Sequence, residues 1–291
     1  MSEPTKSAPL HGFELLERKG RDALAFAQSQ FCNDVTALAP GQWQFNGWLN
    51  PKGRVLALFA LLRTGEDSVW LVLPDAPAAA LAEQLQRFVF RSKVVLRQAT
   101  DWVACGELHA ARLDPPHQAQ GDAVAGWQLD FGAEGGGRTL HLVPREAATM
   151  TADPALDAAW RLFDIRHGLP RLDFDAEHGW TPQMLSLDRL GAYSVKKGCY
   201  PGQEIVARTH FLGQAKRGLV RLCAAAPLPA HGELADAEGR ALGPLVCVAG
   251  ADGASEALAV APLATLSQPM AALMVDATPV EPQPLLEGLR R

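Results

Sequence analysis

Hydrophobic and polar positions follow two different periods along the first third of the chain. Apolar residues alternate with polar ones, or form short unbroken runs, over 43–49, 55–62 and 69–73, a pattern typical of β-strands. Over 22–31 and 75–90 the apolar residues instead recur at helical spacing. This mixture predicts a lobe in which helices pack against a sheet.

The same mixture repeats loosely beyond residue 99. Strand-like segments at 103–113, 127–131 and 139–143 precede a stretch with helical spacing. Asp153 is a good N-cap for that helix, which we expect to end near His167. A second α+β lobe is therefore predicted.

After Gly213 the apolar runs become short and are separated by Pro, Gly and Asp, which favours a small antiparallel β-barrel or sandwich. The fold class predicted from the pattern is thus α+β with a C-terminal β-domain. The expected organisation is a disordered lead (1–11), a first lobe (12–98), a second lobe (99–212), the β-barrel (213–281) and a tail (282–291).

The distribution of charge along the chain singles out one segment. The 291-residue chain has a net charge of −5, which argues against broad nucleic-acid binding. The segment 191–221, however, carries six basic side chains and one acidic side chain, a local net charge of +5. Such a patch suits a small anionic ligand or a weak RNA contact, and a solvated basic face is the simpler explanation.

The cysteines and the lengths of the apolar runs indicate the compartment in which the protein is expected. The five cysteines are odd in number and none forms a Cys-x-x-Cys pair, so neither a disulfide framework nor a dedicated metal site is expected. No run approaches the roughly 20 apolar residues of a membrane span. We therefore expect a cytoplasmic protein with no membrane partner.

The densest chemistry lies at 196–204, Lys-Lys-Gly-Cys-Tyr-Pro-Gly-Gln-Glu. Gly198, Pro201 and Gly202 predict a tight loop. The Cys199 thiol follows two lysines, and nearby cations raise the thiolate fraction of a thiol. Cys199 is thus the candidate functional thiol, with a purely structural loop cysteine as the alternative.

Residues around this thiol could hold a ligand. Lys197 is a candidate for a carboxylate or phosphate, and Arg208 suits a carboxylate through its planar fork. Gln203 and Glu204 could hydrogen-bond the ring nitrogens of a heterocycle. The alternatives are a solvated lysine and an ion pair between Glu204 and Arg208.

Aromatic candidates are ambiguous. Trp160 shares a helix face with Leu156 and Phe163, which favours a core position, although a tryptophan beside a pocket also stacks on flat rings. Phe13 has the same two interpretations. Arg166 and His167 stand where cations complement the end of a helix dipole.

The stretch Lys197-Gly198-Cys199-Tyr200-x-Gly202-Gln203-Glu204 resembles the signature of the YgfZ family of folate-binding proteins, which are similar in fold to the T-protein of the glycine cleavage system. Supporting matches are Asn33-Asp34-Val35, Pro51-Lys52-Gly53-Arg54-Val55, Pro182-Gln183-Met184-Leu185 and Leu212-Gly213-x-x-Lys216-Arg217. The resemblance extends over roughly residues 12–280.

This resemblance implies a three-lobed, ring-like body with a folate cavity and a C-terminal barrel. It implies tetrahydrofolate as cofactor, and a role in supporting iron–sulfur enzymes or assembly proteins, including enzymes that thiolate tRNA. Trp160 and Phe13 would then face the pterin, with Lys197 and Arg208 near the folate's glutamate tail and Cys199 at the cavity mouth.

Two departures weaken an enzymatic interpretation. T-protein relatives carry paired aspartates where this chain has Ala57 and Leu58, and a pterin-binding glutamate where it has Arg166. We therefore expect an accessory protein and not an aminomethyltransferase. A tetrahydrofolate-dependent one-carbon transferase and an RNA- or protein-interaction module using 191–221 stay open as alternatives.

Overall fold

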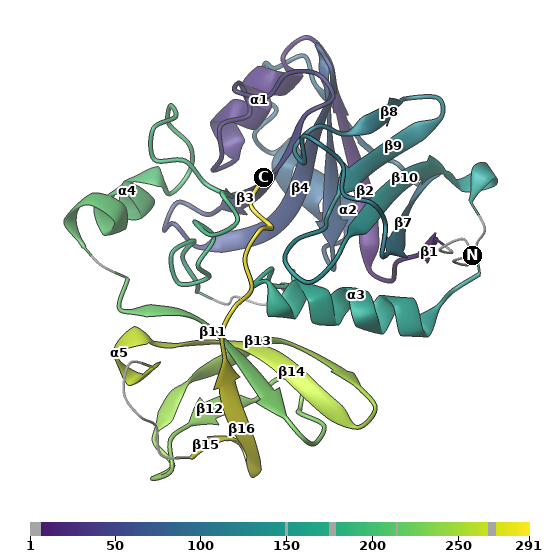
Figure 1. Ribbon diagram of the computed structural model, residues 1–291. Helices are drawn as coiled ribbons and strands as arrows, with labels where there is room; N and C mark the ends of the chain where they lie inside the picture. Colours follow the sequence, from purple (N-terminus) through teal and green to yellow (C-terminus); the bar gives the residue numbers. More distant parts are fainter. Residues whose placement is uncertain (1–6, 149–150, 175–178, 214, 267–271) are drawn as a thin grey trace.

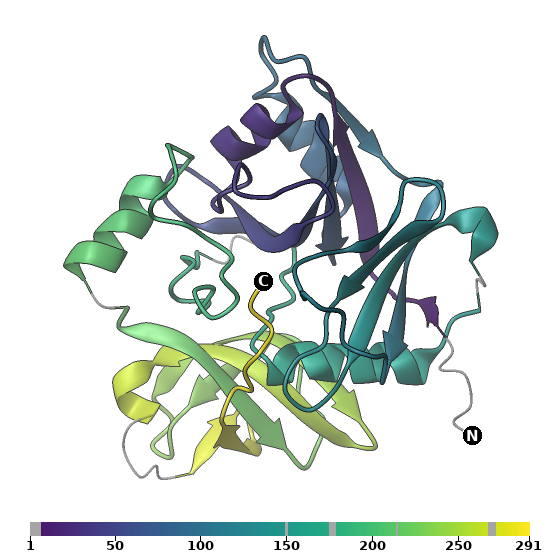
Figure 2. The ribbon, with the colours of Figure 1, turned by 45° about the horizontal axis from the view of Figure 1, so that its top comes forward.

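The computed structural model describes residues 7–148, 151–174, 179–213, 215–266 and 272–291. Two five-stranded sheets and a closed six-stranded barrel form three parts arranged around the C-terminal end of the chain (Figures 1 and 2). None of the helices in these described ranges is long and apolar enough to cross a membrane.

The first lobe is a sheet of order β3-β4-β5-β2-β6 with two helices on one face. Along β4, Leu58, Ala60 and Leu62 pack toward the second lobe, while Phe59 and Leu61 pack under the helices. Both faces are buried, which explains the unbroken apolar run. The elements are β2 (Phe13–Lys19), α1 (Ala23–Gln30), β3 (Trp43–Leu49), β4 (Val55–Gly65), β5 (Ser68–Pro74), α2 (Ala78–Gln86) and β6 (Val95–Gln98).

The second lobe is a sheet of order β1-β7-β10-β9-β8, and α3 contacts β7 of this sheet. The Asp153 carboxylate accepts hydrogen bonds from the backbone N–H groups of Ala155 and Leu156 at the start of α3, which confirms the predicted cap. The elements are β1 (Ala8–Pro9), β7 (Trp102–Leu108), β8 (Gln120–Asp122), β9 (Gly126–Asp130), β10 (Arg138–Pro144), a 3₁₀ turn (Arg145–Ala147) and α3 (Pro154–Arg166).

The prediction of a disordered lead over residues 1–11 is wrong for the C-terminal part of that range. Ala8 pairs with Gly106 of β7, and Leu10 is buried. Apolar side chains at these two positions join the main core, so the chain is already ordered before Phe13. Residues 1–6 lie outside the described residues.

The C-terminal domain is the predicted barrel. Its strands close in the antiparallel order β11-β14-β13-β12-β15-β16 around an apolar core of its own. The elements are β11 (Arg217–Ala224), β12 (Glu233–Ala235), β13 (Ala241–Ala251), β14 (Ala254–Pro262), α5 (Leu263–Leu266), β15 (Leu273–Val275) and β16 (Thr278–Gln283).

The segment beyond the barrel, which the sequence predicts as a tail (282–291), is docked against the body. Residues 284–291, called the C-terminal segment below, run back from β16 to the middle of the molecule (Figure 2). The Leu286 N–H donates to the Arg166 carbonyl at 2.8 Å, and Leu289 is buried in the main core. The segment therefore contacts both the second lobe and the end of α3.

Buried ion pairs join the lobes. Asp164 of α3 pairs with Arg138 of β10 at 2.6 Å and with Arg171 at 3.2 Å. Arg171 also pairs with Asp75, the residue after β5, at 2.7 Å. Arg138 and Asp164 are almost fully buried, so each charge depends on its partners.

The loop 196–204 is held against the β3–β4 turn by two glycines and leads into a helix that the sequence does not predict, α4 (Gln203–Leu212). Gly202 has a left-handed backbone (φ +77°). A Cβ on Gly202 would lie 2.5 Å from the Asn50 carbonyl oxygen and 2.6 Å from the Gly53 Cα. Only glycine therefore allows this approach.

We predict that Gly202→Ala destabilises the protein, because the new methyl group meets backbone atoms and the left-handed conformation is strained. The expected loss is about 1–3 kcal/mol of unfolding free energy. Gly198→Ala is the matched control, since nothing lies within 4 Å of its added Cβ. Denaturant titration of both variants measures the difference, and equal midpoints would contradict the close packing.

Candidate functional site

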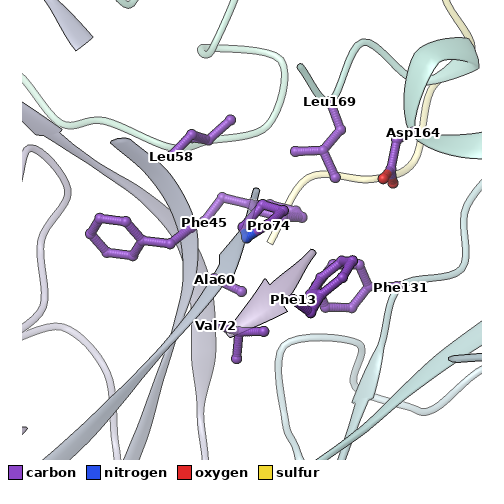
Figure 3. Close-up of a pocket in the computed structure, with 10 residues that line it drawn as sticks. Phe13, Phe45, Leu58, Ala60, Val72, Pro74, Phe131, Asp164 and Leu169 are labelled. Carbon is purple, nitrogen blue, oxygen red and sulfur yellow. The ribbon is translucent and has the colours of Figure 1, made fainter. Parts of the chain in front are cut away.

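A narrow cavity lies between the first sheet and the second lobe, close to the C-terminal segment (Figure 3). Its volume of about 10 Å³ is room for roughly one water molecule. The walls are apolar except for one carboxylate. The lining residues are Phe13, Phe45, Leu58, Phe59, Ala60, Val72, Pro74, Phe131, Asp164 and Leu169.

Aromatic rings form a connected group on one side of this cavity. Phe131 stacks on Trp43 with ring centroids 4.9 Å apart and the planes nearly parallel. Phe45 meets Phe131 edge to face at 5.6 Å. Phe131 and Phe45 thus present aromatic surface to the cavity while Trp43 supports Phe131.

Asp164 is the charged residue of the cavity wall, and two arginines neutralise it. Burial lowers the pKa of Arg138, and the Asp164 carboxylate opposes that shift. For Arg171 burial acts in the same direction, but attraction by Asp164 and Asp75 outweighs it and raises the pKa. The Asp164 carboxylate thus favours the charged form of both buried guanidinium groups.

Arg171 also packs on Phe13, an aromatic residue of the cavity wall, without itself lining the cavity. Its guanidinium carbon lies 4.7 Å from the centroid of the Phe13 ring. Its Nη2 is buried and has no hydrogen-bond partner in the part of the chain that the structure describes. A donor without an acceptor is costly in a buried site, so this nitrogen is suited to a ligand oxygen.

The two predicted aromatic contacts occupy different positions. Phe13 lines the cavity. Trp160 is 1% exposed and lies behind Phe131 at 5.9 Å, with the Arg138 guanidinium over its ring at 4.4 Å. Trp160 is therefore a core residue that supports the cavity wall, the alternative that its helical spacing favoured.

The positions that differ from the T-protein pattern are also separated. Leu58 lines the cavity, whereas Ala57 packs on the other face of β4. Arg166 is half-exposed and binds Glu256 of the barrel at 2.6 Å through its Nη2. The acid at the cavity is thus Asp164, two residues before Arg166 on α3.

Lys197 has a structural role in place of the expected ligand contact. Its ammonium donates to the carbonyls of Gln28, Phe31 and Asn33 at 2.5–3.0 Å and is buried. Burial lowers its pKa to about 8, so it is still protonated at neutral pH, as three donated hydrogen bonds require. The ammonium binds the loop to the end of α1.

Other side chains of the loop also bind the backbone. The Gln203 amide donates to the Lys197 carbonyl at 3.0 Å, and the Tyr200 hydroxyl donates to the Ser194 carbonyl at 3.2 Å. Tyr200 is buried, while Gly198 and Cys199 are exposed. The loop is therefore a supported structure that presents a thiol to solvent.

Glu204 and Arg208 lie on exposed positions of α4, on the outer side of the molecule (Figure 1). Within the described ranges no ion pair joins them. Neither they nor Lys197, Gln203 and Cys199 line the cavity of Figure 3. The structure thus separates the thiol loop from the cavity, which the sequence placed together.

Sequence reasoning missed the charged residues that shape the cavity. Asp75, Arg138, Asp164 and Arg171 come from four separate segments of the chain. Arg138 directly follows the Gly135-Gly136-Gly137 turn, so nothing in its local sequence marked it as a buried charge. No His, Cys, Asp and Glu cluster suited to a metal ion occurs among the described residues.

Comparisons with known proteins agree with this geometry. The GCVT N-terminal domain family matches residues 10–109. The aminomethyltransferase T of the glycine cleavage system from Bartonella henselae superposes with a TM-score of 0.75 at 16% identity, covering 97% of this chain and 85% of that chain. This likeness establishes the T-protein-like fold.

Sequence relatives narrow the assignment further. The tRNA-modifying protein YgfZ of Cronobacter sakazakii is 29% identical over 236 residues, 74% of this chain and 70% of the relative. The tRNA-modifying protein YgfZ of Vibrio vulnificus is 30% identical over 231 residues, 74% of this chain and 69% of the relative. Together with the loop at 197–204 and the T-protein-like fold, these matches mean that the chain belongs to the YgfZ family.

Proposed function

We propose that this protein is a cytoplasmic, tetrahydrofolate-binding accessory protein that supports iron–sulfur enzymes and tRNA modification, including thiolation. The observation that carries the proposal is the aromatic cavity between the lobes, with a single carboxylate in its wall. Family membership supplies the link to tRNA modification, since the YgfZ relatives are named as tRNA-modifying proteins.

The chemistry of the cavity suits a pterin ring. Phe13 and Phe131 offer faces or edges to a flat heterocycle, and such aromatic contacts add about 0.5–1.5 kcal/mol each. The Asp164 carboxylate can accept from the ring's N–H groups, and the unpartnered Arg171 Nη2 can donate to its carbonyl oxygen. The cavity must widen to admit the ring, because it now holds about one water.

The same wall explains why binding, and not one-carbon transfer, is proposed. Leu58 presents a hydrocarbon side chain to the cavity at a position where an acid would be needed to move a proton. Both oxygens of the Asp164 carboxylate are already engaged in ion pairs, one with Arg138 and the other with Arg171. Tetrahydrofolate would supply one-carbon chemistry when bound, and these residues would hold and orient it.

Cys199 supports a second part of the proposal. Its thiol is exposed on a loop that hydrogen bonds hold in place, and Cys199 does not line the inter-lobe cavity. A thiol in such a position is open to a macromolecular partner, for example an iron–sulfur enzyme, an assembly protein or a thiolation enzyme with its tRNA. The basic segment 191–221 would favour an anionic partner.

Calorimetry with 5-formyltetrahydrofolate, a stable reduced folate, tests the cavity. We predict saturable binding that weakens about tenfold in Phe13→Ala, because one aromatic wall is lost. Phe88→Ala is the control, since Phe88 is 48% exposed and does not line the cavity. Absence of binding at about 1 mM ligand, or equal effects of both variants, would contradict the assignment.

A cellular assay tests the thiol. Cys199→Ala is expected to reduce thiolated nucleosides in tRNA, measured by mass spectrometry in cells that lack the native copy. Its unfolding free energy should stay within about 0.5 kcal/mol of the parent, because the side chain is exposed. Cys223→Ala, on the barrel, is the control and should restore thiolation. A large loss of stability with Cys199→Ala would indicate a structural cysteine instead.

A further inference from the structure

The C-terminal segment occupies the place where the three parts of the molecule meet (Figures 1 and 2). It has no regular secondary structure. Few backbone hydrogen bonds hold it, including Leu286 N–H to the Arg166 carbonyl at 2.8 Å and Glu134 N–H to the Glu287 carbonyl at 3.1 Å. Arg189 also binds it, through the Leu286 carbonyl at 2.7 Å and the Glu287 carboxylate at 2.9 Å. Its most deeply buried side chains are Leu289 and Arg291.

Arg291 fills a subsite shaped for a flat cation. Its guanidinium donates to the Asp130 carbonyl at 2.7 and 2.9 Å and to the Gly132 carbonyl at 2.6 Å. The guanidinium carbon lies 5.6 Å from the centroid of the Trp43 ring, and the Asp130 carboxylate is 3.7 Å away. The side chain is only 1% exposed.

Burial and charge at this subsite act in opposite directions. Burial lowers the pKa of Arg291 to about 10, and the Asp130 carboxylate opposes that shift. Arg112 already pairs with the same carboxylate at 2.8 Å. Arg291 is therefore bound mainly by two backbone carbonyls and an aromatic face, because it shares the Asp130 carboxylate with Arg112. A competing cation can replace it.

This segment touches the cavity wall at both ends. Trp43, under Arg291, stacks on Phe131 of the cavity. Leu285 lies against Gly168, next to the cavity residue Leu169, with its methyl carbons 3.2–3.3 Å from where a Cβ on that glycine would be. Figure 3 shows the segment passing beside Leu169 and Asp164.

We propose that Trp43, Asp130 and Gly132 form a guanidinium-binding subsite, that Arg291 is its built-in occupant, and that a folate enters the cavity only when Arg291 leaves. The proposal rests on the folate-binding function proposed above. The cavity holds about one water while the segment is docked, and its release frees the supports of Phe131 and Leu169.

Docking of the C-terminal segment and binding of folate are then two linked equilibria. If docking of Arg291 weakens folate binding by a given factor, folate weakens docking by the same factor. The apparent dissociation constant equals the intrinsic constant divided by the fraction of molecules in the released state. Removing the Arg291 side chain therefore tightens folate binding without adding any contact to the folate.

The first test compares 5-formyltetrahydrofolate affinity by calorimetry. Arg291→Ala is expected to bind about tenfold more tightly than the parent, and Arg290→Ala, whose only described side-chain bond is to the Asp188 carbonyl at 3.4 Å, within about twofold. Should Arg291→Ala fold poorly, Arg291→Lys keeps the charge and loses the planar fork, and should shift affinity in the same direction. Equal or weaker binding in the Arg291 variants would overturn the coupling.

A second measurement uses the unmodified protein. Amide hydrogen exchange of peptides covering 285–291 should speed up on saturation with 5-formyltetrahydrofolate, because the segment leaves its site. Slower or unchanged exchange would overturn the proposal.

A third arm separates the subsite from the folate proposal. Methylguanidinium chloride at about 20 mM should raise the Tm of Arg291→Ala above a matched sodium chloride control and leave Arg290→Ala unchanged, since only the former has a vacated subsite. No such selectivity would overturn the subsite itself. Selective stabilisation without folate binding in any variant would keep the subsite and refute the folate function.

Discussion

The chain of buried ion pairs from Arg138 through Asp164 and Arg171 to Asp75 is the constraint on which the rest of the structure depends. It joins the second sheet, α3 and the end of the first sheet. Arg138, Asp164 and Arg171 are almost fully buried, and Asp75 is 24% exposed. Loss of one member would leave its partner charged and buried, a penalty of about 3–5 kcal/mol. The lobes are thereby fixed at a spacing that leaves an aromatic cavity between them, with the network's own carboxylate in the wall.

The candidate site is divided into two separate parts of the molecule. The aromatic cavity proposed for the pterin lies inside, between the lobes, whereas the thiol lies outside on a loop attached to the β3–β4 turn and to the end of α1. Both are connected through one hairpin, because Leu58 of the cavity and Gly53 under the loop belong to the β3–β4 region. A folate and a protein partner could thus bind at the same time without competing for space.

Much of the fold could be predicted from local pattern, and most of the site could not. The alternation and short runs of apolar residues predicted the strands of both sheets and of the barrel, and the Asp153 cap predicted the start of α3. The helix α4 was missed because it begins after a left-handed Gly202 with no side-chain cap. Lys197 looked like a ligand residue, since only the folded structure brings three carbonyls from 28–33 to its ammonium. The docking of 284–291 could not be predicted from local pattern, because Arg291 binds the carbonyls of Asp130 and Gly132, which lie 161 and 159 residues earlier in the sequence.

A crystal structure of the protein with bound 5-formyltetrahydrofolate tests the central claim most directly, because it locates the ring relative to the ion-pair network. We predict that the pterin lies between Phe13 and Phe131 with its N–H edge toward Asp164. A folate bound outside the lobes, against the 196–204 loop or the barrel, with the inter-lobe cavity still closed, would contradict the claim.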